Sequence, residues 1–463
     1  MKNFSLLAAI AIAILTVSCN GTQAAPSATP FVPSQTQAPT RLATPTTVPP
    51  LSTPSRTATA AATPTVTSTV GPTATPTTPP EAQLHSDCLS VLPALPNGSA
   101  SSGVVVLESR ANVDGYYNGE TYLTDLTAGT TITVEHDGIR NLVSPDRTLT
   151  AYNSAIVDAQ HRIIANNLII ANASGKQLKV IPWETGWARI LGWTDDRRVV
   201  LYRSEPGVTY LKYDTYLVLD PFTGQRRVLG RDFRKFPNPP YPRTLGWEGW
   251  YGVLYDPTFT RAIYPQLVGT NDQQLTYALW DVSQQRLVTS LDNSFALPAQ
   301  DNDIYPMPHW SADGSKFVFR GLLDVSSTLA LFELYSVSRD GQVEQLTHLT
   351  SVALVQDGNL SWSPDGRYIA MFLNHWRVSI SQEPARAAVL DTTNLEIKDY
   401  CFPVSSGGGL GLPRPIWSPD GRQFLVSEQG VPHPRVILVD IIKGFAAQIS
   451  QDTEATGWMT SIH

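Results

Sequence analysis

Short apolar runs alternate with polar turns along most of the chain beyond residue 102. Six of these runs follow a turn that reads Trp-Ser-Pro-Asp-Gly or a degenerate version of it, and the turns begin at Val143, Trp193, Tyr255, Trp310, Trp362 and Trp417. In such a turn Pro presets φ, Asp bonds to the nearby backbone and Gly relieves the exit. Each copy predicts a turn that feeds a strand, and copies spaced by 50 to 62 residues indicate a repeat architecture.

A second series of apolar strands, each followed by a polar turn, counts seven; the strands end at Asp125, Asn172, Asp220, Asp281, Ser338, Asp391 and Asp440. Six turns and seven hairpins agree if a C-terminal strand around Trp458 completes an N-terminal blade that begins near Val104. We therefore predict an all-β, seven-bladed β-propeller over residues 103–463, closed by its C-terminal strand, with six blades as the alternative. The apolar strand after each turn is expected to be the inner strand of its blade.

Three of the turns are the most regular, and their key residues are Trp310 with Asp313, Trp362 with Asp365, and Trp417 with Asp420. Together with the closing Leu346 and Thr347, these units resemble the TolB-type propeller repeat, a relative of the WD-type repeats. The resemblance implies a β-propeller. TolB itself has an N-terminal α/β domain that has no counterpart here, so its Pal-binding role is not carried over.

The repetition of the turns bears on the role of their carboxylates. An Asp in a Pro-Asp-Gly turn accepts backbone N–H bonds, so Asp313, Asp365 and Asp420 are expected to be structural. The Trp residues in front of them are expected to pack between blades. We assign no catalytic residue.

The N-terminus predicts export and anchoring. Residues 1–18, with Lys2 before an apolar run, are typical of a signal peptide, and the following Cys19 resembles the lipidated Cys of bacterial lipoproteins. An ordinary signal peptide with an incidental Cys is the alternative. Residues 19–84 are rich in Pro and Thr and predict a disordered, lipid-anchored stalk, followed by a leader segment at 85–102. Localisation on the extracytoplasmic face of a membrane would follow.

Cys88 and Cys401 are the two cysteines left after Cys19. An even pair in an exported chain predicts one disulfide, which would hold the leader segment against the propeller rim. Two buried free thiols are the alternative.

The net charge and the motifs of the sequence limit the classes of partner and cofactor that we expect. The net charge is −7 and no Lys/Arg run occurs, which argues against nucleic acid. The eight His residues are scattered, without a zinc motif, and the chain has no G-x-S-x-G motif. We expect no metal and no cofactor.

The longest spacing between turns comes from residues 233–255, which are dense in aromatic residues. Tyr241, Trp247, Trp250 and Tyr251 are candidate ligand-binding residues, because aromatic side chains on a long loop suit sugar stacking or a protein hot spot. The alternative is a loop that buries its own rings.

Two hypotheses of function follow. The first is a non-catalytic binding module for a protein or glycan ligand at the cell envelope, attached to the membrane by its N-terminal lipid. The alternative is a glycoside hydrolase or lyase with acidic residues at the central channel. The enzyme would need two facing carboxylates about 5–9.5 Å apart, with a raised pKa on one of them.

Overall fold

The structure is a computed structural model that describes residues 83–99, 101–109, 112–113, 116–117, 120–134, 142–157, 163–183, 187–194, 196–204, 215–230, 254–258, 260–268, 274–284, 286–291, 297–298, 309–324, 331–349, 352–354, 359–375, 383–406 and 412–460. All of these residues belong to one compact unit, Thr65–His463. The regular elements in the described part are β-strands, as the alternating pattern predicts.

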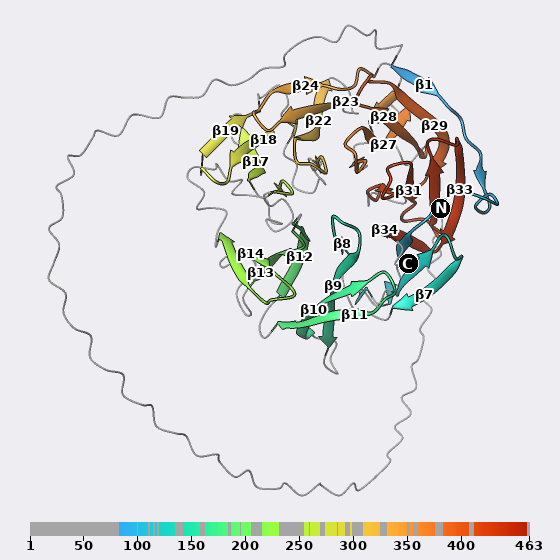
Figure 1. The fold of residues 1–463 in the computed structure, drawn as a ribbon. Helices are drawn as coiled ribbons and strands as arrows, with labels where there is room; N and C mark the ends of the chain where they lie inside the picture. The colour runs from blue at the N-terminus through green and yellow to red at the C-terminus, as the bar shows by residue number, and fades with distance from the viewer. Residues whose placement is uncertain are drawn as a thin grey trace, which may run out of the picture. The chain divides into compact units, whose positions relative to one another are not determined.

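Seven sheets of four to six strands surround one axis and form the blades of a propeller (Figure 1). Blade 1 holds β34 (Thr453–Met459), β3 (Val104–Ser109), β6 (Thr121–Asp125) and β7 (Thr130–Val134). Blade 2 holds β8 (Leu142–Val143), β9 (Leu149–Val157), β10 (Ile163–Asn172) and β11 (Gln177–Trp183). Blade 3 holds β12 (Trp187–Trp193), β13 (Val199–Ser204), β14 (Thr215–Leu219) and β15 (Arg226–Gly230).

The remaining blades repeat this order. Blade 4 holds β16 (Leu254–Tyr255), β17 (Arg261–Val268), β18 (Gln274–Asp281) and β19 (Arg286–Ser290), with β20 (Leu297–Pro298) on β18. Blade 5 holds β21 (His309–Trp310), β22 (Lys316–Asp324), β23 (Leu331–Ser338) and β24 (Val343–Gln345). Blade 6 holds β26 (Ser361–Trp362), β27 (Tyr368–His375), β28 (Ala385–Asp391) and β29 (Ile397–Val404), with β25 (Val352–Leu354) on β27. Blade 7 holds β30 (Ile416–Trp417), β31 (Gln423–Ser427), β32 (Arg435–Asp440) and β33 (Phe445–Gln451); β4 (Asn112–Val113) and β5 (Tyr116–Tyr117) form a separate hairpin.

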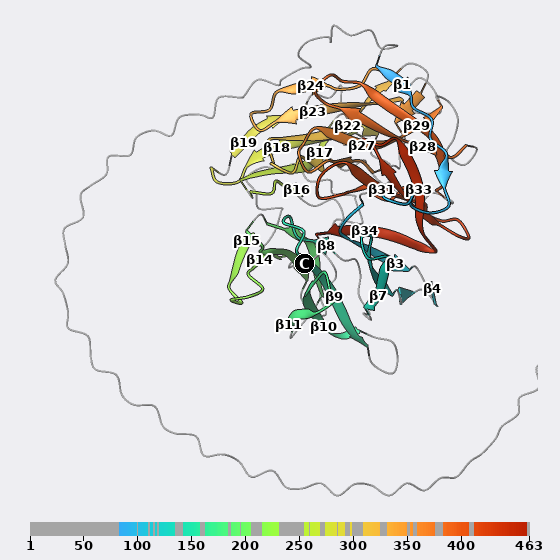
Figure 2. The ribbon, with the colours of Figure 1, turned by 45° about the vertical axis from the view of Figure 1, so that its right-hand side comes forward.

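The prediction of seven blades is confirmed, and the alternative of six is wrong. The predicted closure is also confirmed, because β34 pairs antiparallel with β3 and supplies the inner strand of blade 1 (Figure 2). This pairing satisfies the backbone groups of β3 that would otherwise form an open edge.

The blades pack because their strands are apolar on both faces. In β3, Val104 and Val106 join a cluster with residues of blade 2, whereas Val105 and Leu107 join a cluster with residues of blade 7. Successive side chains of a strand point to opposite faces, so one short apolar run serves two interfaces. Corresponding clusters link blades 2 and 3, 4 and 5, 5 and 6, and 6 and 7.

One expectation about the blades is wrong. The apolar strand after each turn, such as β27 or β31, is the second strand from the axis (Figure 1). The inner strand is the one before the turn, and it carries the Trp of the turn in blades 3, 5, 6 and 7. In blades 2, 4, 5, 6 and 7 this inner strand is two residues long, and the longer apolar run lies one position outward.

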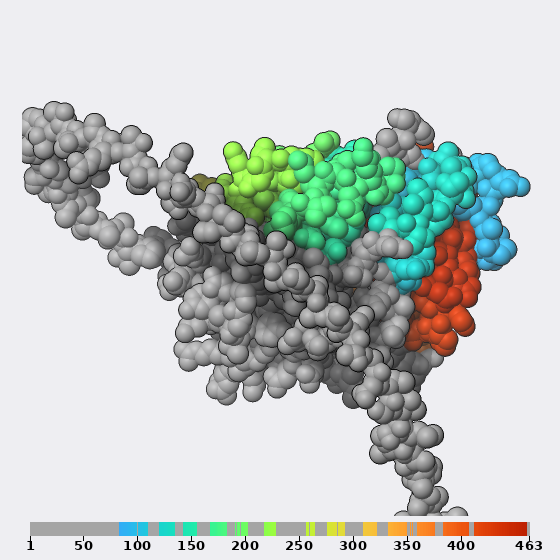
Figure 3. Space-filling model, turned by 90° about the horizontal axis from the view of Figure 1, so that it is seen from below, coloured from blue at the N-terminus to red at the C-terminus, as the bar shows by residue number. Residues whose placement is uncertain are grey.

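The leader segment runs along the outer edges of two blades. Its strand β1 (Leu84–Ser86) pairs parallel with β29 of blade 6, and β2 (Val91–Leu92) pairs parallel with β33 of blade 7. In the space-filling view this blue segment lies against the red C-terminal blade (Figure 3). The leader therefore covers sheet edges that would otherwise expose unpaired backbone groups.

Cys88 lies between β1 and β2, and it forms a disulfide with Cys401 of β29. The bond joins residues 313 positions apart in the sequence. It holds the leader against blade 6 between its two strand pairings.

Candidate functional site

The inner strands are joined by indole hydrogen bonds. Trp417 Nε1 donates to the main-chain oxygen of Ser361 at 3.0 Å, and Trp362 Nε1 donates to that of His309 at 3.2 Å. Trp193 Nε1 donates in the same way to Leu142 at 2.8 Å. In each case the acceptor precedes the equivalent position of the preceding blade, so the repeated Trp joins neighbouring blades at the axis.

The repeated Asp residues bond within their own turns. Asp365 accepts a hydrogen bond of 2.5 Å from the Ser363 hydroxyl and one of 3.1 Å from the Arg367 amide. Asp313 and Asp420 each accept from the Ser two residues before them at 2.6 Å. These carboxylates therefore form hydrogen bonds that stabilise their own turns.

Arg147 departs from the residue pattern of the regular turns. It occupies the position that Gly314, Gly366 and Gly421 take in the regular turns, and its φ of 59° is in the same left-handed region. A side chain in that region costs about 1–2 kcal/mol, which a Gly would avoid. Arg197 stands at the same position in blade 3, with φ of 62°.

The Arg147 side chain reaches across three blades. Its Nη1 donates to the main-chain oxygen of Trp417 in blade 7 at 2.5 Å and to that of Trp458 in blade 1 at 3.4 Å. Its own carbonyl, in blade 2, accepts a hydrogen bond of 2.9 Å from the Thr460 amide, just after β34. The Arg197 side chain extends only to the neighbouring blade 2, where it forms an ion pair with Asp146.

Three basic residues of non-adjacent blades are related through their charges. Arg147 belongs to blade 2, His309 to β21 of blade 5, and Arg414 precedes β30 of blade 7. The charge of Arg414 contributes to lowering the pKa of both other groups.

Burial lowers the pKa values of these groups further. Burial first, and the charge of Arg414 second, lower the pKa of the Arg147 guanidinium to about 10, although Asp420 acts in the opposite direction. Burial, followed by the charges of Arg414 and Arg320, lowers the pKa of His309 well below its usual 6.5. His309 is therefore neutral at pH 7, while both arginines keep their charge.

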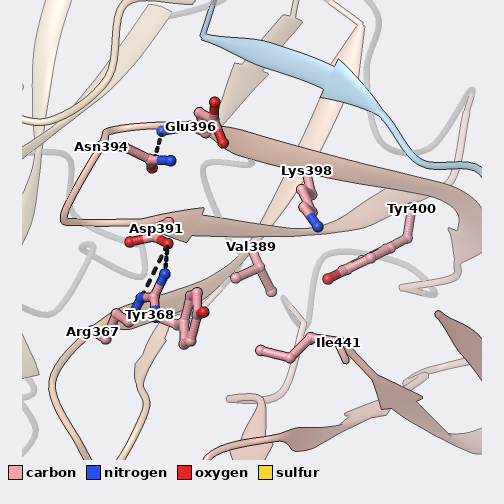
Figure 4. A pocket seen from close by; sticks show the side chains of 9 residues that line it. All are labelled: Arg367, Tyr368, Val389, Asp391, Asn394, Glu396, Lys398, Tyr400 and Ile441. Atoms are coloured by element: carbon pink, nitrogen blue, oxygen red, sulfur yellow. Dashed lines mark hydrogen bonds and ion pairs between the residues drawn. The ribbon is translucent and has the colours of Figure 1, made fainter. Parts of the chain in front are cut away.

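A second feature is a pocket of about 220 Å³ at the contact of blades 6 and 7 (Figure 4). Arg367 Nη2 lies 2.7 Å from Asp391 Oδ2, and the guanidinium lies 4.8 Å from the centre of the Tyr368 ring. The Tyr400 hydroxyl is buried without a hydrogen-bond partner among the described residues, and burial raises its pKa. The charges of Arg367 and Asp391 compensate each other, and Glu396 and Lys398 also line the pocket.

Some of the residues singled out in the sequence lie outside the described ranges. These are Cys19 and the aromatic candidates Tyr241, Trp247, Trp250 and Tyr251. Within the described ranges, no three His, Cys, Asp or Glu side chains gather so that they could hold a metal ion. In the same part of the chain, no helix has the length and apolar character needed to cross a membrane.

The sequence interpretation missed Arg147, His309 and Arg414. A signal was present for the first, because an Arg stands where three aligned turns have Gly. His309 directly precedes Trp310 and Arg414 lies three positions before Trp417, which places both at the entry of an inner strand. Aligning the residues before each Trp would have drawn attention to them.

The fold defines the protein as a seven-bladed β-propeller, and solved structures with this kind of fold resemble it. TolB from Acinetobacter baumannii matches at 14% identity with a TM-score of 0.40, over 77% of this chain and 82% of that chain. The Pseudomonas aeruginosa periplasmic gluconolactonase PpgL matches at 14% identity with a TM-score of 0.45, over 78% of this chain and 98% of that chain. An oligogalacturonate lyase in complex with manganese matches at 11% identity with a TM-score of 0.44, over 76% and 86%. No family model and no curated protein matches the sequence.

Proposed function

We propose that the protein is an exported, lipid-anchored binding module, which uses its propeller to bind a protein or glycan ligand at the cell envelope without transforming it. The observation that carries the proposal is a set of basic side chains from three blades. The charge of Arg414 of blade 7 acts on Arg147 of blade 2 and on His309 of blade 5, and these side chains carry hydrogen-bond donors from three blades. Polar groups supplied by several elements are typical of a ligand site.

The rival function is a glycoside hydrolase or lyase, for which a carboxylate with a raised pKa is one requirement. Burial raises the pKa of Glu333 to about 7. Its two oxygens, however, accept hydrogen bonds of 2.5 Å from the Thr347 hydroxyl and 2.7 Å from the Leu349 amide. Glu333 therefore already has partners within blade 5 and supplies no free acid to a facing carboxylate.

Export and anchoring are supported by the N-terminal sequence alone, and they have a direct test. The full chain, expressed in a bacterial host with radiolabelled palmitate, should carry the label and sediment with membranes. The Cys19→Ala variant should lose both properties. A wild-type chain without label, or a label that persists in the variant, would refute lipid anchoring at Cys19.

Ligand capture is tested by crosslinking the full chain in intact cells. Replacing both Trp247 and Trp250 by Ala should reduce the crosslinked partner and leave the thermal melt unchanged, as expected for aromatic side chains that contact a ligand. Phe222→Ala is the matched control, because Phe222 is an aromatic residue with 42% of its surface exposed in another turn. If the double variant also lowers the melt, the aromatic residues stabilise the fold instead.

A further inference from the structure

The pocket between blades 6 and 7 is built on one face of blade 6. Glu396, Lys398 and Tyr400 occupy alternate positions where β29 begins, so their side chains point to the same face of the sheet. Val389 of β28 lies opposite Lys398 in the strand register and belongs to this face as well. Paired strands therefore fix the spacing of these lining residues, which a loop would not do.

The Tyr400 hydroxyl is a buried polar group that indicates a ligand. Tyr400 is 1% exposed, and its ring packs against Phe424 of blade 7 with the ring centroids 6.2 Å apart. Its hydroxyl oxygen has no hydrogen-bond partner among the described residues, and it points into the pocket (Figure 4). A buried polar group without a partner costs free energy and is rare in native proteins. A polar group of a molecule in the pocket would satisfy it.

Polar groups lie at two ends of the pocket, with apolar side chains between them. In Figure 4 the ion-paired Asp391 lies at one end, and the polar ends of Lys398 and Tyr400 lie at the other. The side chains of Val389 and Ile441 lie between these two ends, and Ile441 comes from blade 7. A ligand that fits this arrangement has apolar surface in its middle and hydrogen-bonding groups around its edge.

The charges that line the pocket are balanced. Two basic side chains, Arg367 and Lys398, are matched by two acidic ones, Asp391 and Glu396. Asp391 already accepts hydrogen bonds from Arg367 and from Thr393, which leaves Glu396 as a carboxylate open to a ligand. The lining thus combines donors and acceptors without a net charge. Such a set suits hydroxyl groups, which both donate and accept hydrogen bonds.

We propose that this pocket binds a single sugar unit of a glycan, with the ring carbons against Val389 and Ile441 and the hydroxyl groups bonded to Tyr400 and Lys398. The inference rests on the proposed binding function and selects a glycan as the ligand. A sugar ring has apolar C–H faces and a rim of hydroxyl groups, which is the combination that the lining requires. The volume of about 220 Å³ limits the occupant to a small group.

Saturation-transfer NMR of the full chain tests the site, with glucose, galactose and N-acetylglucosamine as probes and with glycine as a zwitterionic probe. At least one sugar should bind. Tyr400→Phe keeps the ring and removes the hydroxyl, so it should raise the Kd for that sugar roughly fivefold, as expected for one lost hydrogen bond. Without sugar the variant should melt at the wild-type temperature or above, because the hydroxyl has no partner among the described residues.

Two further variants make the result specific. Lys398→Gln should also weaken sugar binding, whereas Lys179→Gln, at an exposed lysine on the outermost strand of blade 2, should leave the Kd unchanged. Failure of all three sugars to bind, binding of glycine alone, or equal binding by wild type and Tyr400→Phe would overturn the site. A lower melting temperature of Tyr400→Phe would do the same, since the hydroxyl would then have a partner in the fold. In these cases, a crosslinked partner that persists with Tyr400→Phe in cells would leave the binding function standing.

Discussion

The indole of Trp417 donates a hydrogen bond of 3.0 Å to the main-chain oxygen of Ser361, and it thereby joins blade 7 to blade 6. Trp417 is 2% exposed and packs against Phe424, with ring centroids 5.1 Å apart. The residue therefore contributes both buried apolar area and one specific polar contact. The two contributions can be separated by substitution.

Trp417→Phe should lower the free energy of unfolding by about 1 kcal/mol for the hydrogen bond and more for the smaller ring, whereas Trp417→Ala should lower it by about 3–5 kcal/mol. Urea unfolding followed by circular dichroism measures both. Phe222→Ala, at an exposed aromatic residue, serves as the control and should change stability little. Equal losses for Phe and Ala at position 417 would contradict the assigned packing role.

The closure of the ring depends on a glycine in its last strand. A Cβ added to Gly457 would lie 2.3 Å from Cγ2 of Val143 in blade 2. Gly457→Ala should therefore destabilise the protein by about 1–3 kcal/mol, because Val143 is stiff at χ1 and cannot move aside.

The matched test is the double variant Gly457→Ala with Val143→Ala, which removes the clashing methyl groups. It should be more stable than the sum of the two single losses implies, as measured by a double-mutant cycle in urea. Strict additivity would show that the tight contact does not limit blade closure.

The disulfide between Cys88 and Cys401 should stabilise the fold, because it closes a long loop in the unfolded chain. Replacing both residues by Ser should cost up to about 4–5 kcal/mol on the chain-entropy model. Reductant should lower the wild-type melting temperature to that of the variant and leave the variant unchanged. Faster hydrogen exchange at the Asp87 and Leu89 amides, which bond to Asp399 and Tyr400, would locate the loosened leader.

Glu333 should make stability depend on pH. Burial raises its pKa from 4.5 to about 7, so the folded state holds a proton that the unfolded state has released between these values. The contribution of Glu333 to the free energy of unfolding is therefore fully present below pH 4.5. It decreases as the pH rises toward 7, by roughly 3 kcal/mol in total.

The variant Glu333→Gln should lose this slope, since it cannot ionise. The comparison is made by urea unfolding of both proteins at several pH values from 4.5 to 8. If both proteins show the same pH profile across that range, the carboxyl group is not protonated in the folded state.

The repeats allowed much of the fold to be predicted. The turns at Trp310, Trp362 and Trp417 marked three blades directly, and the weaker turns at Val143 and Trp193 followed by alignment. Turn chemistry and strand periodicity are local properties, so sequence carries them well. The pairing of a C-terminal strand with Val104 was inferable because only closure reconciles six turns with seven hairpins.

The sequence misplaced one strand in each of the six blades that contain a repeated turn. Apolar character identified the run after each turn as a buried strand, and it is buried, as Ile369 in β27 shows. Apolar character could not tell the inner strand from the second one. Both are enclosed by protein, and the distance of each from the axis is a property of the whole ring.

By itself, the sequence determined the repeat unit and favoured seven blades closed by the C-terminal strand, because these depend on local turns and on their count; the structure decided between seven blades and six. Only the tertiary structure decided that the leader pairs with β29 and β33, and that the charge of Arg414 acts on Arg147 and His309. These basic residues lie far apart in the chain and share no motif. Their relation depends on the ring placing non-adjacent blades around one axis, which is a long-range consequence of closure.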